Sequence, residues 1–206
     1  KLTLNQHFFV ALCRQQCATG RKRLQIDAQT SLWAFGEAKD LLEGLNSFSV
    51  RSAAEMGEKI DNLQPSAQVI VMAAAISDFK KNNPSEQKIS KEFFLKSIFN
   101  DLEQTSDLLK NQTRKKLENQ IFLGFAAETG SDDEIIKKGE KKRVLKGCDL
   151  LMANPIDRAG QGFEKNFNSG FLLGPKKMVK KLSFSTKLSI SHQLLDEIRN
   201  LKSKIY

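Results

Sequence analysis

Three short apolar segments of the sequence each run directly into small or polar residues that could contact a ligand. The pairs are 67–75 before Asp78, 120–125 before Glu128 and 149–153 before Asn154. Continuous apolar runs of this length predict buried parallel strands. In an open α/β sheet, ligands bind beyond the carboxyl ends of the strands. The three segments therefore predict one ligand site, where an aspartate could accept hydrogen bonds from a ribose or help to hold a metal ion.

Asp78, Asn154 and Phe125, which lie at or near these strand ends, also have ordinary structural explanations. Asp78 could be a helix cap or a turn residue, and Asn154 could cap the turn ahead of Pro155. Phe125 could pack in the core or stack on a base, and its position in the strand favours the core.

Lysines are the second candidate feature. Lys142 and Lys146 lie one helical turn apart, so both can point toward one ligand. Lys88 and Lys91 belong to a polar loop that could close over phosphates. Taken singly, each lysine is as well explained by a solvated surface. Together with three strand ends, the four lysines predict a nucleotide or phosphate site.

The elements that position these residues alternate along the chain. Capping-box patterns predict helices after Ser52 and from Ser131 to Lys146, with Gly147 as the stop. Further helices are predicted from Thr105 or Ser106 to about Leu117, and over the amphipathic stretch 194–205. Two strands near an edge are predicted over 169–173 and 178–183. Strands alternating with helices predict an α/β fold with a mostly parallel sheet covered on both faces.

Composition limits the function classes. The chain has 206 residues, which suits a single domain, 40% hydrophobic residues and a net charge of +9. No apolar run approaches the roughly 20 residues of a membrane helix, and no secretory leader is expected. The basic runs lack the interleaved aromatic residues of a nucleic-acid platform. Three cysteines at irregular spacing do not form a disulfide framework, so a reducing cytoplasm is expected.

Seven motifs, taken in order, resemble those of phosphopantothenoylcysteine synthetase. They are Ser52-Ala-Ala-Glu-Met56, Met72-Ala-Ala-Ala-Ile-Ser-Asp78-Phe79, Lys88-Ile-Ser-Lys91, Thr105-Ser-Asp-Leu-Leu109, Leu123-Gly-Phe-Ala-Ala-Glu-Thr129, Lys142 to Lys146 with Cys148-Asp-Leu-Leu-Met-Ala-Asn154, and Gly162-Phe163 with Asn168. The resemblance covers the chain from about Ser47 to its end.

The resemblance implies a Rossmann-like three-layer fold with a small protruding strand pair, and a two-step ligase that is usually a homodimer. Phosphopantothenate would be activated by CTP as an acyl-cytidylate, and cysteine would then displace CMP. Magnesium would accompany the nucleotide. The family domain is usually fused behind a flavin-dependent decarboxylase, so no FMN is expected in this chain, and neither nucleic acid nor a membrane is an expected partner.

The resemblance also implies roles for individual residues. The backbone of Met72, Ala73 and Ala74 would lie along the nucleotide, with Asp78 in contact with it and Lys88 reaching the phosphates; Asp78 and Lys88 are the catalytic candidates. The remaining members of the implied CTP site are Ser106, Asp107, Leu108, Leu109, Phe125, Lys142 and Lys146.

The first 46 residues depart from this pattern. The family opens with a strand and a glycine-rich TAGGTxExID turn, followed by an SNxSSGxMG motif, and neither motif is present here. This segment is predicted to hold no clean strand. The alternatives to a ligase are a non-catalytic nucleotide-binding or dimerisation remnant that lacks the first βα unit, and a basic RNA-associated protein. The latter would bind generic RNA in a salt-dependent way.

Overall fold

The central element of the fold is an eight-stranded sheet. The computed structural model describes residues 7–11, 31–35, 46–48, 50, 52–74, 76, 78–81, 102–161 and 165–203. From one edge to the other, the strands are β10 (Met178–Thr186), β9 (Phe167–Gly174), β8 (Leu150–Pro155), β7 (Ile121–Glu128), β4 (Val69–Met72), β1 (His7–Ala11), β2 (Ser31–Phe35) and β3 (Asn46–Phe48). The six strands from β8 to β3 are parallel, while β9 and β10 are antiparallel to their neighbours. The α/β prediction with a mostly parallel sheet is confirmed.

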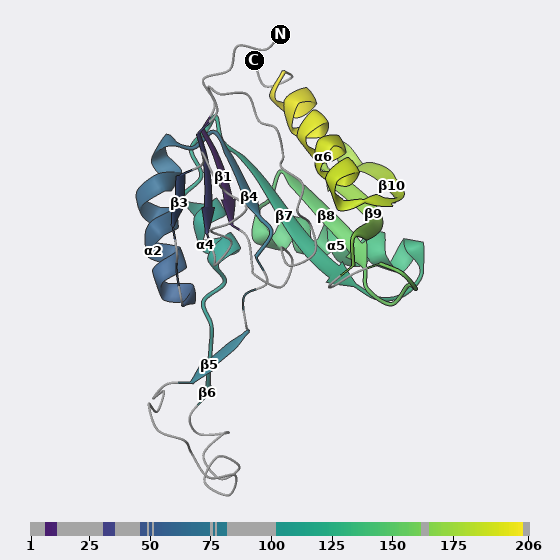
Figure 1. The fold of residues 1–206 in the computed structure, drawn as a ribbon, viewed down its shortest axis with the longest axis horizontal. Coiled ribbons are helices and arrows are strands. Elements are labelled where there is room, and N and C mark those ends of the chain that lie inside the picture. Colours follow the sequence, from purple (N-terminus) through teal and green to yellow (C-terminus); the bar gives the residue numbers. More distant parts are fainter. Residues whose placement is uncertain are drawn as a thin grey trace, which may run out of the picture.

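Helices cover both faces of the sheet, which gives three layers (Figure 1). On one face lie α2 (Ala53–Leu63), α4 (Leu108–Arg114) and α5 (Asp132–Lys146), and on the other lies α6 (Lys187–Lys202). The alternation of side chains along each strand divides the core between the two faces.

The strand β7 illustrates this division. Phe122 packs with α2 and α4, whereas Ile121 and Leu123 pack on α6. All three side chains are almost completely buried. Fully buried parallel strands need apolar residues on both faces, which explains the continuous apolar runs in the sequence.

The amino-terminal prediction is wrong. The segments His7–Ala11 and Ser31–Phe35 form strands, and β1 pairs in parallel with both β2 and β4. Each is a run of five mainly apolar residues, a composition and length typical of a strand even without a glycine-rich turn beside it. The first strand of the sheet is therefore present, although the family's glycine motifs are not.

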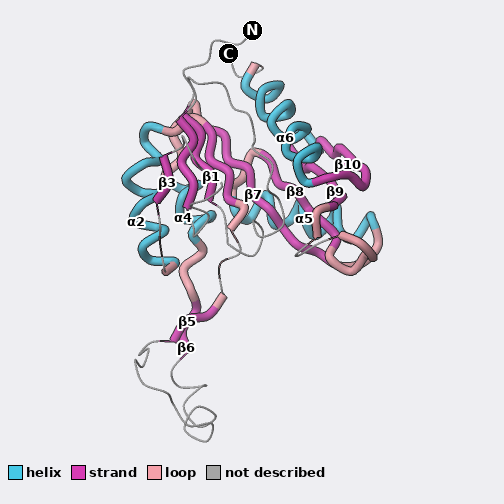
Figure 2. Tube along the Cα trace, viewed as in Figure 1, coloured by secondary structure: helices cyan, strands magenta, loops and turns pink. Residues whose placement is uncertain are grey.

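The strand pair predicted near an edge, over 169–173 and 178–183, is confirmed as β9 and β10 at one edge of the main sheet. The small pair separate from that sheet is β5 (Phe79–Lys81) with β6 (Leu102–Gln104), which stand away from the body of the molecule (Figure 2). The helix predicted from a cap at Thr105 or Ser106 to about Leu117 runs from Leu108 to Arg114, because Asp107 caps it by accepting a hydrogen bond from the Lys110 amide.

Candidate functional site

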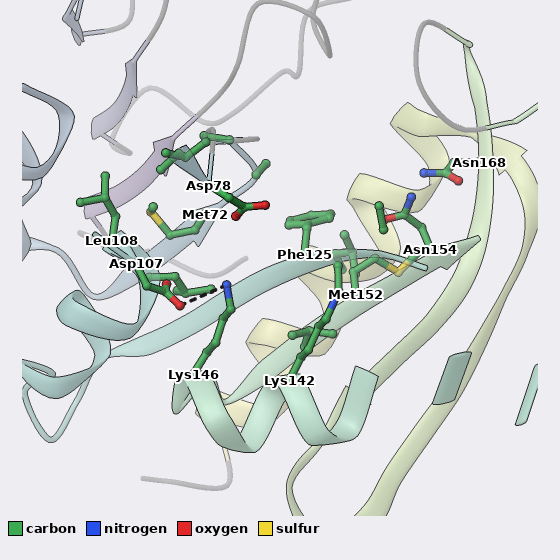
Figure 3. A pocket seen from close by; sticks show the side chains of 18 of the residues that line it. Met72, Asp78, Asp107, Leu108, Phe125, Lys142, Lys146, Met152, Asn154 and Asn168 are labelled. Atoms are coloured by element: carbon green, nitrogen blue, oxygen red, sulfur yellow. Dashed lines mark ion pairs between the residues drawn. The ribbon is translucent and has the colours of Figure 1, made fainter. Parts of the chain in front are cut away.

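A cavity of about 630 Å³ opens where the parallel strands β4, β7 and β8 end. Its floor includes Phe125 and Met152, its walls come from α5 and from the turn before α4, and α6 closes the far side. Figure 3 shows the labelled side chains arranged around this space. The position agrees with the rule that ligands bind beyond the carboxyl ends of strands in open α/β sheets.

The structure gathers the predicted nucleotide residues at this one cavity. Those that line it are Met72, Ala73, Ala74, Asp78, Ser106, Asp107, Leu108, Leu109, Phe125, Lys142 and Lys146. Lys88 lies outside the described residues. The roles of the eleven lining residues toward a ligand stay a prediction, because the geometry shows only that they lie close together.

Two segments distant in sequence are joined at the mouth of the cavity. The Thr105 amide donates to the Asp78 carbonyl at 2.8 Å, next to the paired strands β5 and β6. Asp78, just before β5, and Asp107, shortly after β6, therefore both lie at the site. The Asp78 side chain is exposed.

The turn before α4 is ordered by its own side chains. Asp107 Oδ1 accepts from the Lys110 amide at 3.1 Å, and Asn111 Nδ2 donates to Ser106 Oγ at 2.6 Å. Leu108 and Leu109 then bury against the sheet. The sequence Ser-Asp-Leu-Leu thus places two polar side chains at the cavity and anchors them with two apolar ones.

The lysines reach the cavity because of how α5 is built. Ser131 and Glu134 form a reciprocal capping box at its start, and Gly147 ends it in the left-handed conformation, with φ of 69°. The Ser131 backbone amide, followed by its hydroxyl, lowers the pKa of Glu134 below its usual value. Acidic residues in the first turn and Lys146 in the last complement the helix dipole.

The two lysines that α5 brings to the cavity have carboxylate partners. Lys142 Nζ lies 2.6 Å from Glu128 Oε1, and Lys146 Nζ lies 3.4 Å from Asp107 Oδ2. The Glu128 side chain is buried, whereas the Asp107 side chain is 40% exposed. The Lys142 ammonium is therefore paired with a buried carboxylate, and the Lys146 ammonium with an exposed one.

The sequence motifs did not single out the wall formed by α6. Lys187, Ile190, Ser191 and Leu194 line the cavity from this helix. Their spacing of three and four residues was the available signal, since it places them on one face of a helix. Asn154 and Asn168 also line the cavity, on the far side of Phe125 and Met152 from Lys146 (Figure 3).

The described part of the chain holds no cluster of three or more His, Cys, Asp or Glu side chains suited to a metal ion. Mg²⁺ seldom needs such a cluster, because it usually combines one or two protein carboxylates with substrate phosphates. Asp78 and Asp107 line the cavity and fit that kind of donor set.

The cysteine next to the site is not suited to nucleophilic chemistry. Burial, the main cause, raises the pKa of the Cys148 thiol to about 12, and the charge of Asp149 adds to the effect. Its side chain is 4% exposed. Because the thiolate is the reactive form, Cys148 is a packing residue beneath the site.

Comparison with known proteins identifies the family. The model of the DNA/pantothenate metabolism flavoprotein C-terminal domain matches residues 11–201. The chain belongs to this family. The match includes most of the amino-terminal segment, so the family resemblance extends further than the motifs after Ser47 indicated.

Curated relatives of the chain include bifunctional proteins of coenzyme A biosynthesis. The coenzyme A biosynthesis bifunctional protein CoaBC of Bacillus subtilis is 30% identical over 188 residues, which cover 91% of this chain and 45% of that protein. CoaBC of Thermococcus kodakarensis is 32% identical over 160 residues, covering 76% of this chain and 37% of that protein. The chain therefore spans less than half the length of these relatives.

Solved structures agree on the fold. The C-terminal domain of a CoaBC protein superposes with a TM-score of 0.71 at 17% identity, covering 97% of this chain and 98% of the other. A Cab2 variant in complex with phosphopantothenate-cysteine gives a TM-score of 0.65 at 9% identity, covering 98% of this chain and 87% of the other. Among the described residues, no helix has the length and apolar character needed to span a bilayer.

Proposed function

We propose that this domain joins phosphopantothenate to cysteine after activating the acid with CTP. The observation that carries the proposal is the convergence on one cavity of eleven residues that sequence motifs assigned to a nucleotide. The family membership and the CoaBC relatives support the same reaction.

The reaction takes place in two steps. A carboxylate oxygen of phosphopantothenate attacks the α-phosphorus of CTP, so that an acyl-cytidylate forms and pyrophosphate leaves. The cysteine amine then attacks the acyl carbon, forms the amide, loses a proton and expels CMP. Negative charge accumulates in the first step, so lysines in the cavity stabilise it electrostatically.

The residues of the cavity divide these tasks by chemistry. Lys142 and Lys146 supply positive charge from α5, and Phe125 offers a partly exposed ring for stacking on a base. Asp78 and Asp107 would hold the Mg²⁺ that accompanies the nucleotide, and this ion would supply further charge neutralisation. The remaining contribution is positioning of the nucleophile and the leaving group.

A coupled assay tests the proposal directly. With CTP, phosphopantothenate and cysteine present, we expect release of one pyrophosphate for each amide formed. Omission of phosphopantothenate should abolish the release. The same assay with ATP measures the nucleotide preference. Absence of turnover with every nucleotide, in a folded protein, would refute the proposal.

The second candidate is a remnant that binds a nucleotide without turnover, because residues 1–46 lack the family's glycine motifs. The presence of β1 and β2 in the sheet weighs against it, since the first strand has not been lost. Calorimetry separates the two functions: the remnant binds CTP but releases no pyrophosphate.

The resemblance also leads us to propose a cytoplasmic homodimer, with a flavin-dependent decarboxylase as the fused or associated partner. Sedimentation equilibrium of the purified protein tests the dimer. A monomer at micromolar concentration would contradict it.

A further inference from the structure

The last residue of β7, Glu128, is a buried carboxylate. Along this strand, Phe125 packs toward α6, whereas Ala126 packs toward α5. Glu128 lies two residues beyond Ala126, and its side chain therefore also faces α5. The residue is only 8% exposed. It does not line the cavity, but it lies directly behind one residue that does.

That residue is Lys142. Its Nζ atom lies 2.6 Å from Glu128 Oε1, and among the described residues Glu128 makes no other ion pair. The contact with Lys142 is an ion pair that lacks hydrogen-bond geometry, and Oε1 accepts no hydrogen bond from any other described residue. A buried carboxylate without compensation is strongly unfavourable. The charge of Glu128 therefore holds the Lys142 ammonium against the end of β7.

The second lysine that α5 brings to the cavity is held differently. Lys146 lies 3.4 Å from Asp107, whose side chain is 40% exposed and already caps α4. Exposed pairs at this separation are weak and are readily exchanged for another partner. The two lysines thus differ in freedom, since Lys142 is fixed from behind and Lys146 can turn toward an arriving anion.

We propose that Glu128 is a positioning residue, which fixes Lys142 for the transition state of the nucleotide-dependent step. The proposal rests on the proposed function. The charge of Glu128 repels an anionic ligand, which lowers ground-state affinity. By fixing the Lys142 ammonium, Glu128 also favours binding of the same ligand, so the two effects on ground-state affinity oppose each other. Charge that develops during the reaction benefits from a fixed cation, so the effect of Glu128 falls on kcat.

Steady-state kinetics of Glu128→Gln, Lys142→Met and the double variant test this proposal. We expect Glu128→Gln to lower kcat roughly 10- to 100-fold, with the KM for CTP unchanged or lower. If Glu128 acts through Lys142, then Glu128→Gln has no further effect in the Lys142→Met background. An unchanged kcat, or equal losses in both backgrounds, would overturn the proposal.

A matched control is available on α6. Glu197 pairs with Lys180 at 2.7 Å and has a 17% exposed side chain, and neither residue lines the cavity. Glu197→Gln removes a comparable ion pair, so it should leave kcat and the KM for CTP at wild-type values. A loss of kcat equal to that of Glu128→Gln would show that the effect is general destabilisation.

A second readout does not depend on turnover. Acetic anhydride modifies free lysine amines, and mass spectrometry reports the rate at Lys142. Loss of the carboxylate should raise this rate about fivefold in Glu128→Gln, while Glu197→Gln leaves it unchanged. An unaltered rate at Lys142 would refute the hold of Glu128 on this lysine. Should wild type fail to ligate, the proposed function falls, and the modification rate still decides the positioning.

Discussion

Gly139 determines how closely α5 can approach the sheet, and a single methyl group tests that contact. A Cβ atom at this position would lie 2.6 Å from Leu173 Cδ1 and 2.8 Å from Ala153 Cβ. Carbon atoms in contact prefer about 3.5 to 4.0 Å, so the added methyl is roughly 1 Å too close to both neighbours. Ala153 has no rotamer with which to withdraw, and Leu173 is fully buried. The helix itself must shift outward.

The expected cost follows from these contacts. Overpacking of a well-packed core costs about 1 to 3 kcal/mol. Alanine in place of glycine inside a helix returns about 0.5 to 1 kcal/mol. We therefore expect Gly139→Ala to lower the free energy of unfolding by about 1 to 2 kcal/mol. Urea denaturation followed by circular dichroism measures this value, and the m-value should stay constant.

Gly57 provides the control, because it is also a buried glycine within a helix. Its added Cβ would meet only Leu108 Cδ2 at 3.1 Å, which is the end of a flexible side chain. Gly57→Ala should therefore be within about 0.5 kcal/mol of wild type. A Gly139→Ala protein as stable as wild type would refute the close packing of α5. Combination with Leu173→Ala, which removes the nearest atom, should reduce the cost of the added methyl.

Three further outcomes are expected. Ser131→Ala removes one half of the α5 capping box and should lower the free energy of unfolding by about 1 kcal/mol in urea denaturation; a neutral result would contradict the cap. Cys148, with its thiol pKa raised from 9.0 to about 12, should form a mixed disulfide at pH 8 about 1000-fold more slowly in the folded than in the unfolded protein, since thiolate governs the rate. Because the folded-state pKa of this thiol is raised, its contribution to stability is complete below pH 9 and falls as the pH rises toward 12, by up to about 1.4 kcal/mol per pH unit. Cys148→Ala removes the thiol, so the variant should lose less stability than wild type between about pH 9 and about pH 12. Parallel pH profiles of stability for the two proteins would contradict this.

The parts of the fold that the sequence predicted well are those with redundant signals. The helix α5 has a capping box, a dipole-matched charge order and a terminal glycine, and it runs from Asp132 to Lys146 as predicted. The buried strands β4, β7 and β8 are continuous apolar runs, and each is preceded by a helix. Their carboxyl ends had to meet at one edge, so the cavity followed from topology alone.

The parts that the sequence missed depend on partners distant in the chain. The strand His7–Ala11 was missed because no glycine-rich turn stands beside it, and its place between β4 and β2 is set by the sheet. The α6 wall of the cavity is similar, because Lys187 and Ser191 carry no motif and reach the site only through the packing of their helix. Glu128 belongs to the Leu123–Thr129 motif, but its burial, from which the positioning role is inferred, arises only when β7 packs against α5.

The place of β1 in the sheet has a consequence for expression of shortened forms. Motif coverage alone suggests a boundary near Ser47, yet β1 pairs with β4 over four residues, from Phe8 opposite Val69 to Ala11 opposite Met72. A protein that starts at residue 47 would leave the amide and carbonyl groups of β4 unpaired along one side, in the middle of the native sheet. Exposed edges of this kind recruit strands from other molecules. Such a truncation should therefore aggregate rather than yield a smaller soluble domain.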